Sequence, residues 1–365
     1  MNPQKKIKAL DFNRHPGWFS AMNAIWKITY PLGTRPKLDK DSLIKAARKA
    51  TGLHDLGSSF WDEPLERLLS SIREEANLHS IGYFITRQRL TNLLAVRLRA
   101  EELFKKYPEI LEQPLYPIML VVGLQRTGTT KLQRLLAADP ENRALLSWEA
   151  LNPAPINGDI KDGKQRIKIA RTSEKALKII SPAFFTIHPV EHLAPEEDVL
   201  LLDVSFMSQT AEATMHVPSY ASWLEKTNQS PAYEYMVKLL KLLQWQRPGK
   251  RWVLKTPHHL EFLDLTDKYF GNVQYIWPHR NINESIPSFL SMVSHARAIF
   301  SNHVDIHQVV EHWVRKNGYM LERALEFLKK NNHRINITHL QYKEVVKNPM
   351  KALHRIYADR NETIS

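Results

Sequence analysis

A glycine-rich segment with the composition of a phosphate-binding loop follows a short apolar run. Residues 123–130 read Gly-Leu-Gln-Arg-Thr-Gly-Thr-Thr, between the apolar residues 118–122 and leucines at helical spacing. Glycines let the backbone turn tightly, so that successive N–H groups point at one oxyanion, and the following helix start adds partial positive charge. Arg126, Thr127, Thr129 and Thr130 add a guanidinium and hydroxyl donors. The segment predicts a site for a phosphate or a similar anion.

The loop departs from the loop of nucleotide-hydrolysing enzymes at one position. Its two glycines have Walker A spacing, but Thr129 stands where those enzymes carry lysine. A P-loop kinase that uses ATP is the enzymatic alternative, and it would hold magnesium through Asp203, which follows the apolar residues 199–202. The acidic residues 196–198 equally indicate the first turn of a helix there, and we favour that interpretation. An ordinary strand-to-helix turn is the alternative without chemistry.

A second pair of anion-binding residues follows another apolar run. Arg280 comes just past a predicted strand at residues 273–277, where ligands of open α/β sheets collect, and Ser288 lies in the following helix. A guanidinium binds phosphate through two parallel hydrogen bonds, and a hydroxyl donates to a further oxygen. An arginine after a strand is also often only a salt-bridged surface residue. Together with the loop, we predict phosphate binding by both residues.

A third motif has the letters of a zinc site. His188, Glu191 and His192 match the H-x-x-E-H pattern of a zinc peptidase, which must lie on a helix. Pro189 falls inside the required turn and would spoil the ligand geometry. We therefore expect no metal, and a role for His188 in the core or in an acceptor site.

The elements that position these residues predict an α/β fold. Predicted strands at residues 118–122, 251–255, 273–277 and 334–338 are separated by helix-length segments, which indicates a central parallel sheet in a three-layer, P-loop-like arrangement. The first third is helical, because leucines and isoleucines such as Leu65, Leu68, Leu69 and Ile72 follow helix-face spacing. We predict a helical N-terminal region at residues 1–114 and a nucleotide-binding domain at residues 115–365.

Composition narrows the class of protein. The chain of 365 residues has no cysteine, which excludes disulfides, thiolate nucleophiles and cysteine-ligated metals. It has neither an apolar run of about 20 residues for membrane crossing nor a secretory signal, so we expect a cytoplasmic protein. The net charge is +13, and residues 1–50 hold 11 Lys or Arg against 3 Asp or Glu. This basic N-terminus predicts peripheral contact with an acidic membrane, whereas no nucleic-acid-binding module is visible. A homo-oligomer is compatible with the sequence.

These motifs together resemble the bacterial branch of the PAPS-dependent sulfotransferase family, where PAPS is 3′-phosphoadenosine 5′-phosphosulfate. The resemblance rests on the loop at residues 123–130, on Leu-Leu-Ala-Ala-Asp-Pro at residues 135–140 and on Trp148-Glu149. It continues with Lys-Thr-Pro-His-His-Leu at residues 255–260 and His279-Arg280 with Ser288, and so covers roughly residues 50–360. It implies transfer of a sulfuryl group from the co-substrate PAPS to a hydroxyl of a small-molecule or glycolipid-like acceptor.

The resemblance also assigns roles to residues. Arg126, Thr127, Gly128, Thr129 and Thr130 would hold the 5′-phosphosulfate, while Arg280 and Ser288 would clamp the 3′-phosphate.

Sulfuryl transfer needs a base and a stabilised leaving group. Arg126 and Lys255 are the natural choices to stabilise the leaving phosphate, because they are fixed cations, and the candidates for the base come from the family. His259 resembles the catalytic histidine of many cytosolic members, although Pro257 interrupts the pattern and leaves His258 as a rival, and Glu149 resembles the base of other branches. A non-catalytic nucleotide-binding protein is the remaining alternative, and it would tolerate replacement of His259 and Glu149.

Overall fold

The computed structural model describes residue 12 and residues 17–29, 37–156, 160, 163–331 and 333–364. The lysines at positions 5, 6 and 8, on which the expectation of membrane contact rests, lie outside these residues.

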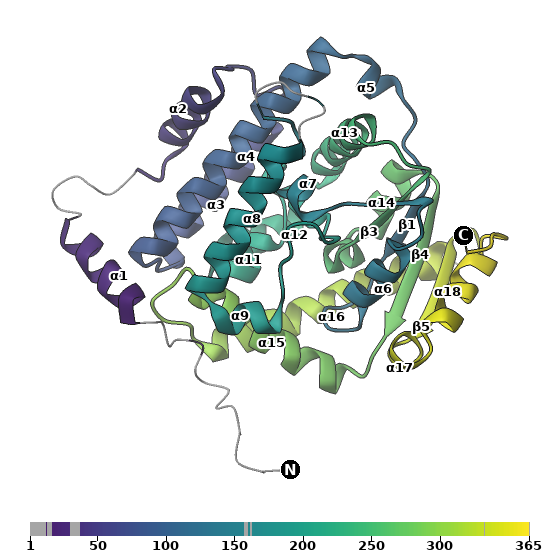
Figure 1. The fold of residues 1–365 in the computed structure, drawn as a ribbon. Coiled ribbons are helices and arrows are strands. Elements are labelled where there is room, and N and C mark those ends of the chain that lie inside the picture. Colours follow the sequence, from purple (N-terminus) through teal and green to yellow (C-terminus); the bar gives the residue numbers. More distant parts are fainter. Residues whose placement is uncertain are drawn as a thin grey trace.

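A five-stranded, all-parallel sheet forms the centre of the fold (Figure 1). Its strands are β1 (Ile118–Val121), β2 (Asn142–Ala144), β3 (Arg251–Lys255), β4 (Val273–His279) and β5 (Asn336–Gln341), in the order β2-β3-β1-β4-β5. In the register, Val121 lies opposite both Lys255 and Ile276, so β1 is the central strand. The four predicted strands are confirmed, although β5 begins two residues later than its predicted start at residue 334. Strand β2 was not predicted.

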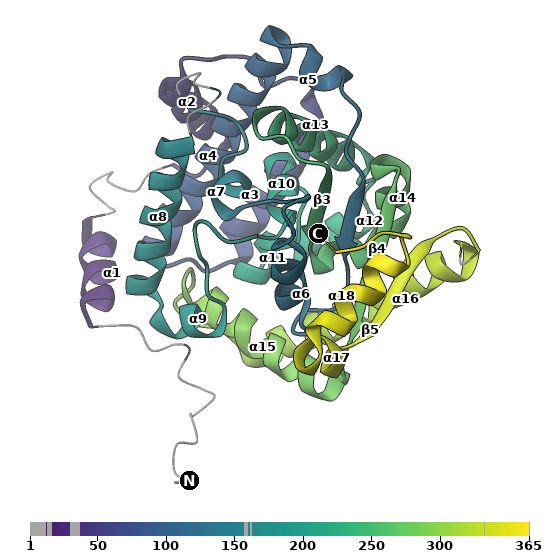
Figure 2. The ribbon, with the colours of Figure 1, turned by 45° about the vertical axis from the view of Figure 1, so that its right-hand side comes forward.

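Helices cover both faces of the sheet, which confirms the predicted three layers (Figure 2). Side chains alternate along a strand, and Met119 and Val121 pack against one layer of helices while Leu120 packs against the other. The first layer holds α6 (Thr129–Leu136), α17 (Tyr342–Lys347) and α18 (Pro349–Ala358). The second holds α13 (Ser230–Gln246), α14 (Leu263–Phe270) and α16 (Ile306–Asn331).

The N-terminal helices that follow α1 (Gly17–Thr29) share a hydrophobic core with the sheet. They are α2 (Lys40–Thr51), η3 (Ser59–Trp61), α3 (Asp62–Glu75), α4 (Ser80–Lys106) and α5 (Glu109–Glu112). Leu65, Leu69 and Leu94 are buried in the same cluster as Leu120 and Leu254 of the sheet. The N-terminal region is therefore helical, as predicted, but its core is continuous with that of the domain that follows.

The remaining helices include most of those that line the site. They are α7 (Ser147–Leu151), α8 (Gly163–Ile180), α9 (Pro182–Ile187), α10 (Val199–Leu202), η4 (Asp203–Ser205), α11 (Thr210–Thr214), α12 (Pro218–Lys226), η5 (Pro257–Glu261) and α15 (Ile282–Ala298). Helix α10 confirms the helical interpretation of residues 199–202. Helix α9 ends at Ile187, so the H-x-x-E-H letters lie outside any helix. Within the described part of the chain, no helix is long and apolar enough to span a bilayer.

Candidate active site

The loop between β1 and α6 has the geometry of an anion cradle. Gly123 and Gly128 have φ of +134° and +90°, values that side chains rarely adopt, and Arg126 lies at +65°. A methyl group at Gly128 would lie 3.0 Å from the Tyr342 ring, so this glycine is also needed for space. None of the described residues accepts a hydrogen bond from the backbone N–H groups of Arg126, Gly128, Thr129 and Thr130. These donors are therefore available to an oxyanion.

The structure brings the second anion-binding pair to this loop. Arg126 Nε donates a hydrogen bond to Ser288 Oγ over 3.1 Å, and Arg280 Nη1 donates to the Arg126 carbonyl over 2.9 Å. The Arg280 guanidinium also lies over the Tyr342 ring, 4.4 Å from its centroid. Arg126, Arg280 and three loop residues (Gly128, Thr129 and Thr130) line one cavity of about 220 Å³. Thr127 instead donates its hydroxyl to the Leu124 carbonyl over 2.7 Å and so stabilises the loop itself.

Another wall of this cavity is formed by Glu197, which is paired with Lys255, a buried residue that does not itself line the cavity. Lys255, at the end of β3, is only 2% exposed, and its Nζ lies 2.6 Å from Glu197 Oε1. The Thr256 hydroxyl donates to the other oxygen of Glu197 over 3.3 Å. Burial raises the pKa of Glu197, but the charge and hydrogen bond of Lys255 lower it more, so the net pKa is below the usual value. The pair therefore presents fixed, opposite charges.

A second, apolar cavity of about 290 Å³ adjoins the first. Both cavities are lined by Gln125, His188, Glu197, Pro257 and Met292. The apolar cavity extends between α9, α10, α15 and α16, and its lining includes Phe184, Leu200, Phe289, Val293 and Trp313. An anion site thus opens directly onto a site for an apolar molecule.

His188 lies where these two cavities meet. Its ring contacts Phe184, and no described residue hydrogen-bonds either ring nitrogen. Burial lowers the pKa of His188, and the positive charges of Lys255 and Arg126 lower it further against the raising effect of Glu196 and Glu197. The imidazole is therefore neutral near pH 7 and able to accept a proton.

His259 does not reach either cavity. It is fully buried, with Nε2 2.9 Å from Asp198 Oδ2 and Nδ1 2.7 Å from the Tyr233 hydroxyl, so both ring nitrogens are occupied. His258 is buried as well, and burial holds its pKa well below the usual value. It is Pro257, the residue before them, that lines both cavities. In this geometry neither histidine can take a proton from an acceptor.

Glu149 is likewise separated from the site by its own partners. It is 1% exposed, and its oxygens lie 3.0 Å from Arg143 Nη2 and 2.8 Å from Arg247 Nη2. It also accepts the Leu146 N–H over 3.1 Å, as a helix cap. Burial raises its pKa, but the two arginines outweigh this and lower it. Glu149 therefore joins α7, β2 and the end of α13, and it cannot act as the base in this arrangement.

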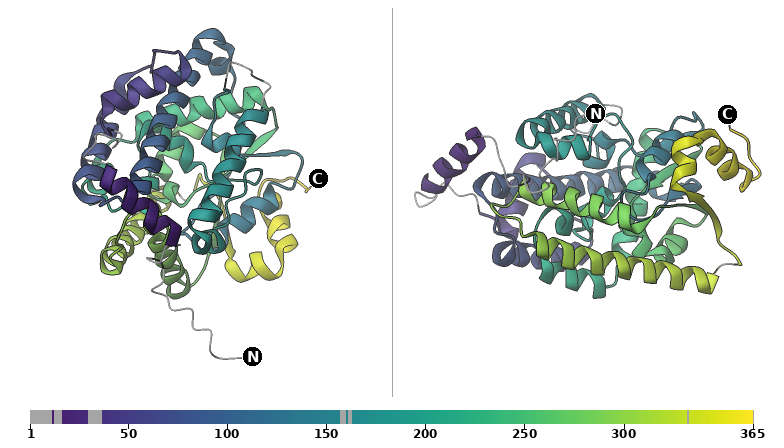
Figure 3. Two further views of the ribbon diagram at one scale, coloured as in Figure 1. Left: turned by 60° about the vertical axis from the view of Figure 1, so that its left-hand side comes forward. Right: turned by 90° about the horizontal axis from the view of Figure 1, so that it is seen from below.

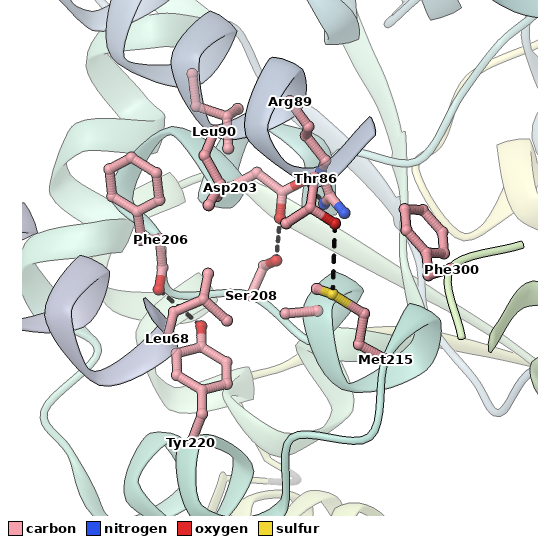
Figure 4. Close-up of a pocket in the computed structure, with 12 residues that line it drawn as sticks. Leu68, Thr86, Arg89, Leu90, Asp203, Phe206, Ser208, Met215, Tyr220 and Phe300 are labelled. Atoms are coloured by element: carbon pink, nitrogen blue, oxygen red, sulfur yellow. Dashed lines mark hydrogen bonds and ion pairs between the residues drawn. The ribbon is translucent and has the colours of Figure 1, made fainter. Parts of the chain in front are cut away.

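Asp203, the magnesium ligand of the kinase alternative, lies in a different place (Figure 4). It pairs with Arg89 of α4 and accepts a hydrogen bond from Ser208. This corner encloses a cavity of about 20 Å³, roughly the space of one water molecule. Asp203 lines neither cavity at the loop. The kinase alternative thus lacks its metal ligand at the phosphate site.

The three residues of the H-x-x-E-H pattern have separate surroundings and do not converge on one point. His192 Nδ1 lies 2.6 Å from Glu174 of α8, and Glu191 pairs with Arg134, while His188 lines the cavities. Across the described ranges, no group of three His, Asp or Glu side chains could hold a metal ion.

Comparison with known proteins agrees with this site. Residues 117–360 match the profile of the sulfotransferase family, so the chain belongs to that family. It is similar to the crystal structure of sulfotransferase STF1 from Mycobacterium tuberculosis H37Rv, with a TM-score of 0.80, 29% identity and coverage of 91% of this chain and 92% of that one. Sulfotransferase STF9 from Mycobacterium avium has the same fold, with a TM-score of 0.81, 24% identity and coverage of 90% and 85%. Among curated proteins there is no significant match. The protein is a sulfotransferase.

The sequence analysis placed three residues of the site incompletely or not at all. His188 was expected in the core or in an acceptor site but not as a base, and Glu197 was seen only as part of an acidic helix start. Tyr342, which packs against Gly128 and Arg280, gives no signal in the sequence at all.

Proposed function

We propose that PAPS is the sulfuryl donor and that a hydroxyl on an apolar molecule is the acceptor. The observation that carries this proposal is the junction of the two cavities: unpaired loop N–H groups with Arg126 and Arg280 on one side, apolar side chains on the other. The loop would hold the 5′-phosphosulfate, and Arg280 with Ser288 would hold the 3′-phosphate. The apolar lining suits the small-molecule or glycolipid-like acceptor that the resemblance implied.

His188 is the proton acceptor in the proposed reaction. This role is supported by its position, because His188 lines both cavities, and a base there would lie beside both the acceptor hydroxyl and the sulfuryl group. His188 takes the hydroxyl proton, the acceptor oxygen forms a bond to sulfur, and the bond from sulfur to the bridging phosphate oxygen breaks. The 3′-phosphoadenosine 5′-phosphate leaves with that electron pair, and Arg126 stabilises its developing charge. Lys255 lines neither cavity, so we assign it the indirect role of holding Glu197 in place at the junction.

Calorimetric titration tests the donor. Wild type and Arg280→Ala are titrated with 3′-phosphoadenosine 5′-phosphate and, separately, with ATP and magnesium. We expect the bisphosphate to bind and the substitution to weaken it at least about tenfold, because a charged phosphate contact contributes roughly 1.5–3 kcal/mol. Preference for ATP with magnesium would instead support the kinase alternative.

Transfer is then measured with labelled PAPS and a set of apolar alcohols and phenols. Appearance of label in one of them supports an enzyme, whereas binding without transfer to any acceptor would favour the non-catalytic alternative. Cytoplasmic location and homo-oligomer formation stay predictions from the sequence.

A further inference from the structure

We propose that helix α1 docks the enzyme on an anionic membrane surface. One side of α1 carries four large apolar side chains in solvent: Trp18 is 45% exposed, Met22 37%, Ile25 58% and Ile28 74%. Their spacing of four, three and three residues places them on one side of the helix. Figure 3 shows α1 at the edge of the molecule. We call these four residues the α1 face.

The other side of α1 is fixed to the protein. Phe19 is fully buried, and its ring meets the His79 ring edge-on at 5.0 Å between centroids. The Asn23 side-chain oxygen accepts the Ile81 N–H over 2.9 Å. Trp26 packs edge-on against Phe84 of α4, which is itself 42% exposed. Because α1 is already anchored through this side, the α1 face is not the surface by which the helix joins the core.

The charge of the N-terminal segment favours an anionic lipid surface over a second copy of the chain as the partner of the α1 face. Residues 1–37 contain seven Lys or Arg and a single acidic residue, Asp11. A second copy of the chain would bring this excess against itself, and like charges repel, whereas anionic lipid headgroups are complementary to it. Tryptophan and isoleucine beside basic residues are the composition of helices that lie in the membrane interface. With 13 residues, α1 is too short to cross a bilayer, which needs about 20. It fits a helix that lies on the surface.

Sedimentation of the full chain with vesicles tests this docking without any need for catalysis. The vesicles contain phosphatidylcholine alone or phosphatidylcholine with phosphatidylglycerol. We expect binding to the anionic vesicles, weakened by salt, and at least about tenfold weaker binding for the triple variant Trp18→Ser, Ile25→Ser, Ile28→Ser. The matched control is Val314→Ser with Leu325→Ser on α16, which also removes apolar side chains that are 50% and 59% exposed. This control should bind as wild type does.

Three outcomes would overturn the proposal. The wild type could fail to sediment with anionic vesicles, or the triple variant could sediment as well as the control, with circular dichroism showing both folded. The third outcome comes from light scattering. If the wild type were a dimer and the triple variant a monomer, a second copy of the chain would cover the α1 face. If wild type and the triple variant have the same molecular mass in light scattering, and only the wild type binds the anionic vesicles, the results support membrane docking.

Discussion

At the scale of single residues, the proposed base differs from the two favoured by the sequence. A base must reach the acceptor with an unoccupied, basic atom, and geometry excludes a candidate before pKa does. His259 and Glu149 have every basic atom engaged by a buried partner, whereas His188 has none engaged among the described residues and lines both cavities. The choice among them therefore depends on contacts that only the fold creates.

Replacing His188 by glutamine should lower kcat by about 10²–10⁴-fold, because a positioned acid–base group contributes that much. Affinity for PAPS should change little. Since burial lowers the pKa of His188, the wild-type rate should rise with pH below the usual histidine range and stay level above it. In the variant that rising limb should disappear.

The control for this prediction is His192→Gln, because His192 is held by Glu174 and lines neither cavity. Steady-state kinetics across pH give both readouts. A full wild-type pH profile in the His188 variant would rule out His188 as the base.

From these contacts we expect Glu149 to contribute to stability rather than to catalysis. Glu149→Ala leaves Arg143, which is 1% exposed, without its carboxylate, and breaking a buried ion pair costs about 3–5 kcal/mol. We expect urea unfolding to show a loss of that size. The folded fraction should keep its kcat, and a large fall in kcat without loss of stability would return Glu149 to the reaction.

At the scale of elements, the phosphate loop depends on one backbone conformation and one gap. Gly128→Ala forces a side chain into φ of +90° and against the Tyr342 ring. Gly52, at the end of α2, has φ of +71° with open space around its Cα, so Gly52→Ala introduces backbone strain without a clash. We expect both variants to lose about 1–2 kcal/mol of stability from that strain. Only Gly128→Ala should also lose affinity for 3′-phosphoadenosine 5′-phosphate.

Thermal unfolding and calorimetry measure these two quantities separately. Equal loss of nucleotide affinity in both variants would show that strain acts globally and that the gap beside Tyr342 is unimportant. Unchanged affinity in both would remove the loop from the binding site.

The elements that sequence predicts and those that it misses differ in what stabilises them. Three of the four predicted strands, β1, β3 and β4, are mostly apolar and buried, so their composition marks them, whereas β5 has buried residues only at alternate positions. Strand β2 reads Asn-Arg-Ala, and its Arg143 packs over the Trp252 ring at 3.9 Å and donates to the Arg247 carbonyl. Such a strand is stabilised by residues about a hundred positions away. Short-range periodicity therefore cannot reveal it.

The same distinction holds for the site. The residues that contact an anion through a local motif, from Arg126 to Thr130, follow directly from the glycine pattern and its strand-to-helix setting. Arg280 and Ser288 were predicted from their place after a strand and in the next helix, only their assignment to the 3′-phosphate came from the family resemblance, and the structure brings them to the loop through Arg126. His188 and Tyr342 come from loops and helices whose positions depend on packing, and no local pattern marks them.

At the scale of the whole molecule, the boundary predicted after residue 114 divides a shared core. Leu65, Leu69, Leu94 and Leu98 are buried against the same cluster as the sheet. Burial of one leucine side chain contributes roughly 1.5–3 kcal/mol, while a whole protein is stable by only about 5–15 kcal/mol. Loss of these four contacts alone would remove most or all of the stability. The helices thus act as part of the folding unit, although the sequence marks them as a separate region.

A chain of residues 115–365 should therefore fail to fold, even though it contains the complete sheet and the phosphate loop. We expect it to aggregate or to unfold without a cooperative transition in urea, whereas the full chain should unfold in one step. The matched control is a chain of residues 37–365, which loses α1 and its few buried contacts but keeps α2, α3 and α4. We expect this shorter truncation to leave cooperative unfolding intact. If residues 115–365 unfolded cooperatively and bound 3′-phosphoadenosine 5′-phosphate, the predicted boundary would mark an independent domain and the shared core would be dispensable.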